Sequence, residues 1–84
     1  MAKDSTLLVV DVGNTNIVLG VYRANELLTS WRFATARERT ADEYGILATQ
    51  LSSPVHPGPF EGAIVASVVP PVNSAIAEMI RKYY

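Results

Sequence analysis

The feature that most constrains the fold of this chain is a pair of short apolar segments joined by a polar turn. The first segment covers residues 6–11, the second covers residues 17–22, and the sequence Val-Gly-Asn-Thr-Asn lies between them. Apolar segments of this length on either side of such a turn predict two antiparallel strands. Both alternating faces of each segment are apolar, so we expect these strands to be covered on both sides of the sheet.

The polar turn has the composition of a phosphate-binding loop. Gly13 permits a positive φ and a close approach of a ligand to the backbone. The neighbouring N–H groups and the Thr15 hydroxyl can donate to phosphate oxygens. A carboxylate such as Asp11 is compatible with phosphates when Mg²⁺ lies between them. The same residues also suit an ordinary hairpin turn, and the pattern Asp-x-Gly-x-Thr alone leaves both interpretations open.

The remaining segments predict one more hairpin strand and then alternating helices and strands. Residues 27–34 predict an outer strand with Leu27, Thr29, Trp31 and Phe33 on one face. Thr40 and Glu43 form a capping-box pattern at the start of a helix, in which Gly45 indicates a close contact. A loop follows at residues 52–59, with His56 expected in solvent. Residues 62–69 predict a strand, and Pro70 begins a second helix.

The predicted order is βββαβα, with the sheet order 3-2-1-4. Two hairpins make the first three strands antiparallel, and the helical connection places the fourth strand parallel to the first. This is an α/β, ribonuclease-H-like arrangement, with the fourth strand at an exposed edge. The tip of the first strand, residues 37–42 and residues 67–70 then meet at one edge of the sheet, where ligands bind in open α/β folds. Arg37 and Arg39 can be either phosphate contacts or solvated charges. Ser67 can be a ligand contact or a small residue beneath the Pro-Pro turn, and we favour the second interpretation.

Three separated motifs resemble the N-terminal part of the type III pantothenate kinases, also called the Bvg accessory factor family. They are the hairpin and the segments 35–45 and 67–71. The family is similar to the acetate kinase/Hsc70/actin superfamily. The resemblance implies an actin-like ATPase half-domain that is truncated, with residues 1–84 forming the N-terminal part of the first domain and the second domain absent. It also implies an ATP site in this chain, in which Asp11 binds the metal ion. The residues of this implied site are Asp11, Val12, Gly13, Asn14, Thr15, Asn16, Ile17 and Val18.

The resemblance further implies phosphorylation of pantothenate by ATP, the first step of coenzyme A synthesis. The implied cofactors are ATP, Mg²⁺ and a monovalent cation, K⁺ or NH₄⁺, and the full-length protein is expected to be a homodimer. The family's catalytic base lies in a later Gly-x-Asp-Arg motif that does not occur before Tyr84. We therefore assign no catalytic residue in this chain and expect residues 1–84 alone to be inactive.

Composition excludes several other classes of protein. The net charge of −1 disfavours a nucleic-acid partner, and the absence of cysteine excludes disulfides and thiolate metal sites. No apolar run is long enough to span a membrane and no signal peptide is evident, so we expect a cytoplasmic protein. Two alternatives remain: a non-catalytic transcriptional accessory or regulatory protein of the same fold, and a nuclease, which needs several carboxylates around two metals.

Overall fold

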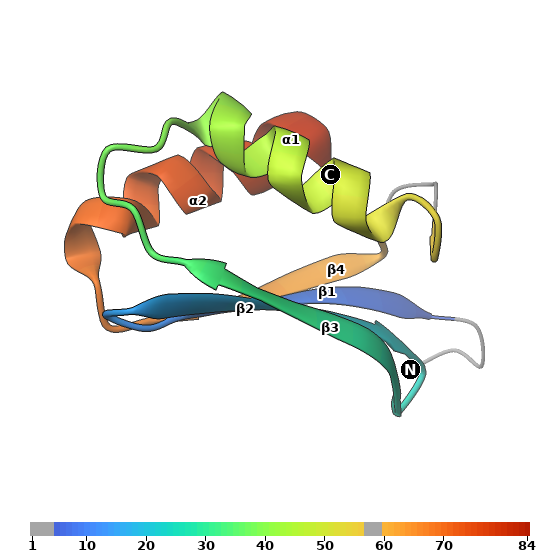
Figure 1. The fold of residues 1–84 in the computed structure, drawn as a ribbon. Helices are drawn as coiled ribbons and strands as arrows, with labels where there is room; N and C mark the ends of the chain where they lie inside the picture. The colour runs from blue at the N-terminus through green and yellow to red at the C-terminus, as the bar shows by residue number, and fades with distance from the viewer. Residues whose placement is uncertain (1–4, 57–59) are drawn as a thin grey trace.

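The computed structural model describes residues 5–56 and 60–84 of the chain. Its elements follow the predicted order and are coloured along the chain in Figure 1. They are β1 (Thr6–Val12), β2 (Asn16–Arg23), β3 (Glu26–Ala34), α1 (Ala41–Ser52), β4 (Gly62–Ser67) and α2 (Pro70–Tyr83). The strand predicted at residues 62–69 ends two residues early, because Val69 already serves as the N-cap of α2.

The four strands form one mixed sheet in the order β3-β2-β1-β4. β1 is antiparallel to β2 and parallel to β4, while β3 is antiparallel to β2. The predicted topology is therefore confirmed, and it is consistent with a half-domain of the actin-like type. β4 has β1 as its neighbour on one side and is the last strand of the sheet that the structure describes.

Both helices begin at the signals present in the sequence. The Thr40 hydroxyl accepts a hydrogen bond from the Glu43 N–H at 3.2 Å, and Glu43 Oε1 accepts one from the Thr40 N–H at 2.9 Å. This reciprocal pair satisfies two of the N–H groups that every helix start leaves without partners. Prolines occupy the first two positions of α2, where no helical N–H is needed.

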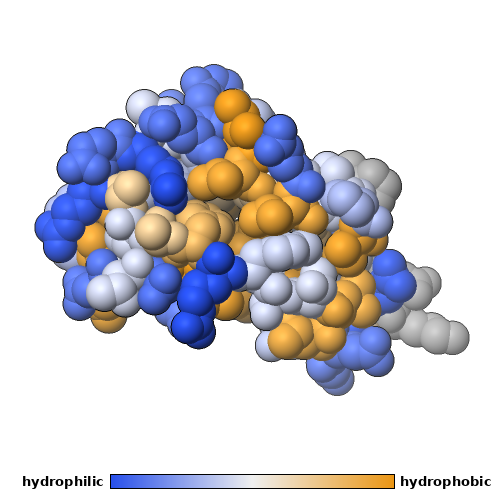
Figure 2. Space-filling model, in the orientation of Figure 1, coloured by the Kyte–Doolittle hydropathy of each residue, from blue (hydrophilic) through white to orange (hydrophobic). Residues whose placement is uncertain are grey.

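The core lies between the sheet and the two helices, which cover the same face of the sheet (Figure 1). Each of the two inner strands alternates buried and less buried residues, and α1 and α2 pack against one another above them. Figure 2 shows hydrophobic residues across the middle of the molecule, between the helical layer and the sheet. The buried apolar side chains are Leu8, Val10, Val12, Ile17, Leu19, Val21, Tyr44, Ala48, Val69, Val72, Ile76 and Met79.

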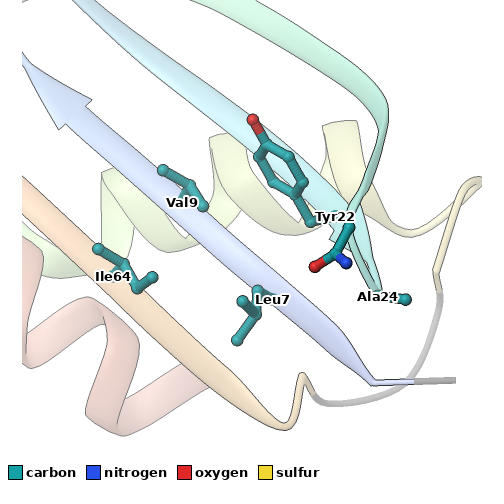
Figure 3. A pocket seen from close by; sticks show the side chains of 6 residues that line it. Leu7, Val9, Tyr22, Ala24 and Ile64 are labelled. Atoms are coloured by element: carbon teal, nitrogen blue, oxygen red, sulfur yellow. The ribbon is translucent and has the colours of Figure 1, made fainter. Parts of the chain in front are cut away.

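The opposite face of the sheet has no helix over it in the part of the chain that the structure describes. The expectation that the first two strands are covered on both faces is therefore wrong for these residues. The physical reason is that both helices pack on one another and on the same face. The open face instead carries a shallow pocket of about 300 Å³ near the β2–β3 turn (Figure 3). Its lining is mainly apolar: Leu7, Val9, Tyr22, Ala24, Asn25 and Ile64.

A β-bulge in β3 places one residue on a different face of the sheet from the one that the sequence predicted. Val21 pairs with Thr29 whereas Tyr22 pairs with Leu27, so Leu28 is an extra residue on the β3 side. Such an insertion reverses the side-chain alternation beyond it. Leu28 packs against the core, and Leu27 is 48% exposed instead of sharing a face with Trp31.

The loop after α1 also differs from the prediction where it is described. His56 is half-buried; its Nε2 lies 3.4 Å from the Thr6 hydroxyl oxygen, and its ring centroid is 4.8 Å from that of Phe60. The expectation of a solvated histidine is therefore wrong. Residues 57–59 of the predicted loop lie outside the described residues, as do residues 1–4.

Candidate functional site

Three separated segments meet at the end of the sheet that carries the β1–β2 turn. The Thr35 hydroxyl donates to the Gly13 carbonyl at 2.7 Å, and the Thr35 N–H donates to the Thr15 carbonyl at 3.0 Å. From the other side, the Val68 N–H donates to the Val12 carbonyl at 3.1 Å. The predicted meeting of the β1 tip with the end of β4 is therefore present, whereas the segment before α1 contacts the turn through Thr35, two residues before the predicted stretch 37–42. This edge is the candidate functional site.

Gly13 suits the turn because it leaves space, and not because of its backbone conformation. No glycine in the described residues has a positive φ, so the expectation that Gly13 uses one is wrong. Its N–H donates to the Asn16 carbonyl at 2.8 Å, and a Cβ built on Gly13 would lie 3.1 Å from that same oxygen. A side chain at this position would therefore press on the hydrogen bond that closes the turn.

The tip of the turn presents donor groups to solvent. Asn14 and Thr15 are exposed, and among the described residues their N–H groups have no acceptor within the protein. The Asn16 side-chain amide donates to the Thr15 hydroxyl oxygen at 3.2 Å, which leaves the hydroxyl hydrogen to donate elsewhere. Two N–H groups and one O–H group at an exposed tip form an arrangement suited to an anion with several oxygens.

Asp11 is exposed near the same end of the sheet, on the face opposite the helices. Its direct neighbours in the sheet are Val18 of β2 and Ala66 of β4. In the residues that the structure describes, no group of three or more His, Cys, Asp or Glu side chains is arranged to hold a metal ion. A single carboxylate with phosphate oxygens nearby still fits Mg²⁺, which keeps several waters and takes few protein ligands.

The other residues of the predicted ATP site have different environments. Val12 and Ile17 pair across the hairpin, and their side chains are buried in the core beneath the helices. Their contribution to a ligand site is therefore limited to the backbone. Val18 is half-buried on the open face beside Asp11.

Arg39 is engaged within the fold. One guanidinium nitrogen donates to the Ala34 carbonyl at 2.7 Å, and the guanidinium carbon lies 5.7 Å and 5.9 Å from the ring centroids of Phe33 and Tyr44. These contacts attach the segment before α1 to the end of β3. Arg37 is exposed, and its role as a phosphate contact stays a prediction.

Two further side chains have local structural roles at this edge. Burial raises the pKa of Tyr44, so its hydroxyl stays protonated and donates to the Ala36 carbonyl at 2.8 Å. The Ser67 hydroxyl accepts from the Val69 N–H at 3.1 Å, inside the β4–α2 turn. The interpretation of Ser67 as a residue of the Pro-Pro turn is therefore confirmed.

Thr35 is the residue at this edge to which the sequence assigned no role. Its position after β3 was evident, but its partners are 20 and 22 residues earlier in the chain. Only the register of β3 on β2 brings them together, because Asn16 pairs with Ala34 and places Thr35 beside the turn. A threonine directly after an outer strand is the one sequence signal that points to such a contact.

The apolar pocket of Figure 3 lies at the other end of the sheet from the turn. Its lining includes Ala24 and Asn25 of the β2–β3 turn and no residue of the β1–β2 turn. It is therefore separate from the candidate site. Separately, no helix among the described residues combines the length and the apolar composition that crossing a membrane requires.

Comparison with known proteins gives a consistent result over nearly the whole chain. A family model described as type III pantothenate kinase matches residues 7–84. The type III pantothenate kinase of Brevibacillus brevis is 51% identical over 80 residues, covering 92% of this chain and 31% of that protein. The corresponding protein of Exiguobacterium sibiricum is 49% identical over 80 residues, covering 93% and 32%. The chain thus spans about a third of the length of these curated relatives.

Proposed function

The chain belongs to the type III pantothenate kinase family, and on that premise we propose that the complete protein transfers the γ-phosphoryl group of ATP to the hydroxyl of pantothenate. The product is 4′-phosphopantothenate, and the reaction is the first step of coenzyme A synthesis. The observation that carries the proposal is the exposed β1–β2 turn, whose N–H groups at Asn14 and Thr15 have no acceptor among the described residues.

In this proposal the turn binds the phosphates of ATP. The N–H groups of Asn14 and Thr15 and the Thr15 hydroxyl donate to phosphate oxygens, while Val12 and Ile17 contribute backbone alone. Asp11 holds Mg²⁺, directly or through water, and the metal neutralises charge on the phosphates. Phosphoryl transfer depends mainly on positioning and on charge neutralisation, and these residues supply part of both.

The remaining components of the reaction are proposed to lie elsewhere in the complete protein. These are the general base, the pantothenate site, the site for K⁺ or NH₄⁺ and a second domain that closes over the nucleotide. Residues 1–84 would then form the N-terminal part of the first actin-like domain. We also propose, from the family resemblance, that the complete protein is a cytoplasmic homodimer.

The test is the formation of phosphopantothenate by the complete gene product, with and without the substitution Asp11→Asn. We expect ATP-dependent product formation by the wild-type protein and a fall in kcat of about 100-fold in the variant, the size typical of losing one electrostatic group at a transferring centre. The free energy of unfolding should change little, because Asp11 is exposed and asparagine keeps its shape.

Glu26→Gln provides the matched control. Glu26 is also an exposed carboxylate of the sheet, but it pairs with Arg23 at the opposite end from the β1–β2 turn. Its substitution should leave kcat within about twofold of wild type. A wild-type protein that binds ATP without phosphorylating pantothenate would contradict the proposal and favour a non-catalytic regulatory protein.

A further inference from the structure

We propose that Thr35 is a positioning residue that holds the β1–β2 turn in the conformation that binds phosphate. The inference rests on the proposed function for its ligand, and on the geometry of the turn for its mechanism. Thr35 directly follows β3, and it makes two hydrogen bonds to the turn from outside the hairpin.

The two bonds hold two different peptide units of the turn. The hydroxyl donates to the Gly13 carbonyl at 2.7 Å, and the N–H donates to the Thr15 carbonyl at 3.0 Å. In a trans peptide the C=O of one residue and the N–H of the next point in opposite directions. Because the Gly13 carbonyl points toward Thr35, the N–H of Asn14 points away from it, toward the exposed tip.

The contact matters because the peptide that it holds follows a glycine. Glycine has wider conformational freedom than any other residue, so the Gly13–Asn14 peptide is the part of the turn that rotates most easily. Rotation would replace the Asn14 N–H at the tip by the Gly13 carbonyl oxygen, whose partial negative charge repels a phosphate. The Thr35 hydroxyl opposes this rotation by engaging the carbonyl.

The hydroxyl and the N–H of Thr35 can be separated by substitution. Valine has the shape of threonine and keeps the backbone bond to Thr15, so Thr35→Val removes the bond to Gly13 alone. Serine keeps the hydroxyl, so Thr35→Ser restores that bond. Thr29→Val is the matched control. Thr29 lies in β3, the edge strand that Thr35 directly follows, but it pairs with Val21 of β2, away from the β1–β2 turn.

The first measurement is steady-state kinetics of the complete protein. In Thr35→Val we expect KM for ATP to rise about tenfold, with KM for pantothenate and kcat within about threefold of wild type, as for loss of one hydrogen bond to the binding conformation. Thr35→Ser should recover KM for ATP to within about threefold, and Thr29→Val should leave it unchanged. A general loss of stability would not raise KM for one substrate selectively.

The second measurement is amide hydrogen exchange of the complete protein without nucleotide. The Gly13 N–H, which donates to the Asn16 carbonyl, should exchange about tenfold faster in Thr35→Val than in wild type or in Thr29→Val. Unchanged Gly13 exchange, or an unchanged KM for ATP in an active Thr35→Val protein, would overturn the inference and leave the proposed function standing. A wild-type protein without kinase activity would overturn the proposed function, and the exchange result would then still decide whether Thr35 holds the turn.

Discussion

At the scale of single residues, close contacts leave little room for a side chain at Gly13 and at Gly45. Gly13 leaves room for the carbonyl of Asn16, and Gly45 of α1 leaves room for the ring of Tyr83 in α2. The described residue with a positive φ is instead Ala24, at 52°, in the two-residue turn between β2 and β3. The expectation that Gly45 marks a close contact is therefore confirmed, and a consequence for stability follows.

We predict that Gly45→Ala destabilises the chain by about 1–2 kcal/mol, although alanine is the better helix former by about 1 kcal/mol. A Cβ on Gly45 would overlap the Tyr83 ring, so the ring must move and give up the hydrogen bond that its hydroxyl donates to Asp42 at 2.8 Å. Urea denaturation monitored by circular dichroism would measure the change in the free energy of unfolding.

A double-mutant cycle separates the two effects of this substitution. In a Tyr83→Ala background the overlap is gone, so Gly45→Ala should stabilise the helix by up to about 1 kcal/mol. A change of sign between the two backgrounds is the expected result. Equal effects in both would show that the contact between Gly45 and Tyr83 does not limit the size of residue 45.

At the scale of secondary-structure elements, the helices are joined by a polar contact as well as by their apolar faces. Asp42 in the first turn of α1 accepts hydrogen bonds from Lys82 Nζ and from the Tyr83 hydroxyl, both at 2.8 Å. Both hydrogen bonds lower the pKa of the Asp42 carboxyl, and the one from Lys82 has the larger effect. The same contact raises the pKa of Lys82 and of Tyr83, so the charged carboxylate is the form that the fold favours.

We predict that this contact makes stability depend on pH on the acid side. The folded-state pKa of Asp42 is depressed, so its contribution is fully present above the ordinary carboxyl pKa of about 3.9 and is lost as the pH falls through the lower folded value. Wild type should therefore be more stable than Asp42→Asn at pH 6, and this difference should shrink at pH 3. The contact is exposed, so added salt should also reduce it.

Glu26→Gln is the control for general effects of acid on the chain. Its stability should follow that of wild type at both pH values, because among the described residues the Glu26 carboxylate makes no hydrogen bond or ion pair like those of Asp42 with Lys82 and Tyr83. If the difference in stability between wild type and Asp42→Asn stayed constant from pH 6 to pH 3, the contact would act through packing and not through charge.

At the scale of the whole molecule, the described structure is a sheet with helices on one face and an apolar strand at its edge. Four consecutive residues of β4, Ala63–Ala66, are exposed, including Ile64 at 54% and Val65 at 42%. The composition of β4 is that of a strand inside a sheet, but its position is that of an edge strand. Unpaired apolar edges of this kind promote association between molecules.

We predict that the 84-residue chain by itself shows weak protection along β4 and associates as its concentration rises. Alternate amides of β4 should exchange about tenfold or more faster than those of β1, and they should slow at higher concentration as edges pair. Hydrogen exchange measured over a hundredfold range of concentration tests this. Protection of β4 equal to that of β1 at every concentration would mean that the edge is covered and that the strand order is different.

Much of this architecture followed from local sequence. The turn at residues 13–16, the capping box of Thr40 and Glu43 and the prolines at the start of α2 each depend on residues a few positions apart. Tyr44 and Ala48 of α1, and Val72, Ile76 and Met79 of α2, likewise recur at helical spacing and are buried. Such features were predictable because short-range hydrogen bonds and side-chain periodicity decide them.

Tertiary structure decided the features that depend on contacts between distant residues. The bulge at Leu28 depends on the pairing of two strands, and it moved Leu27 out of the face predicted for it. The contacts of Arg39 with aromatic rings and of Thr35 with Gly13 depend on where β3 ends relative to the hairpin. The sequence by itself thus determined which residues form the turn and the helices. Only the packed sheet decided which side chains hold that turn, because their partners are brought together by strand register and not by proximity in the chain.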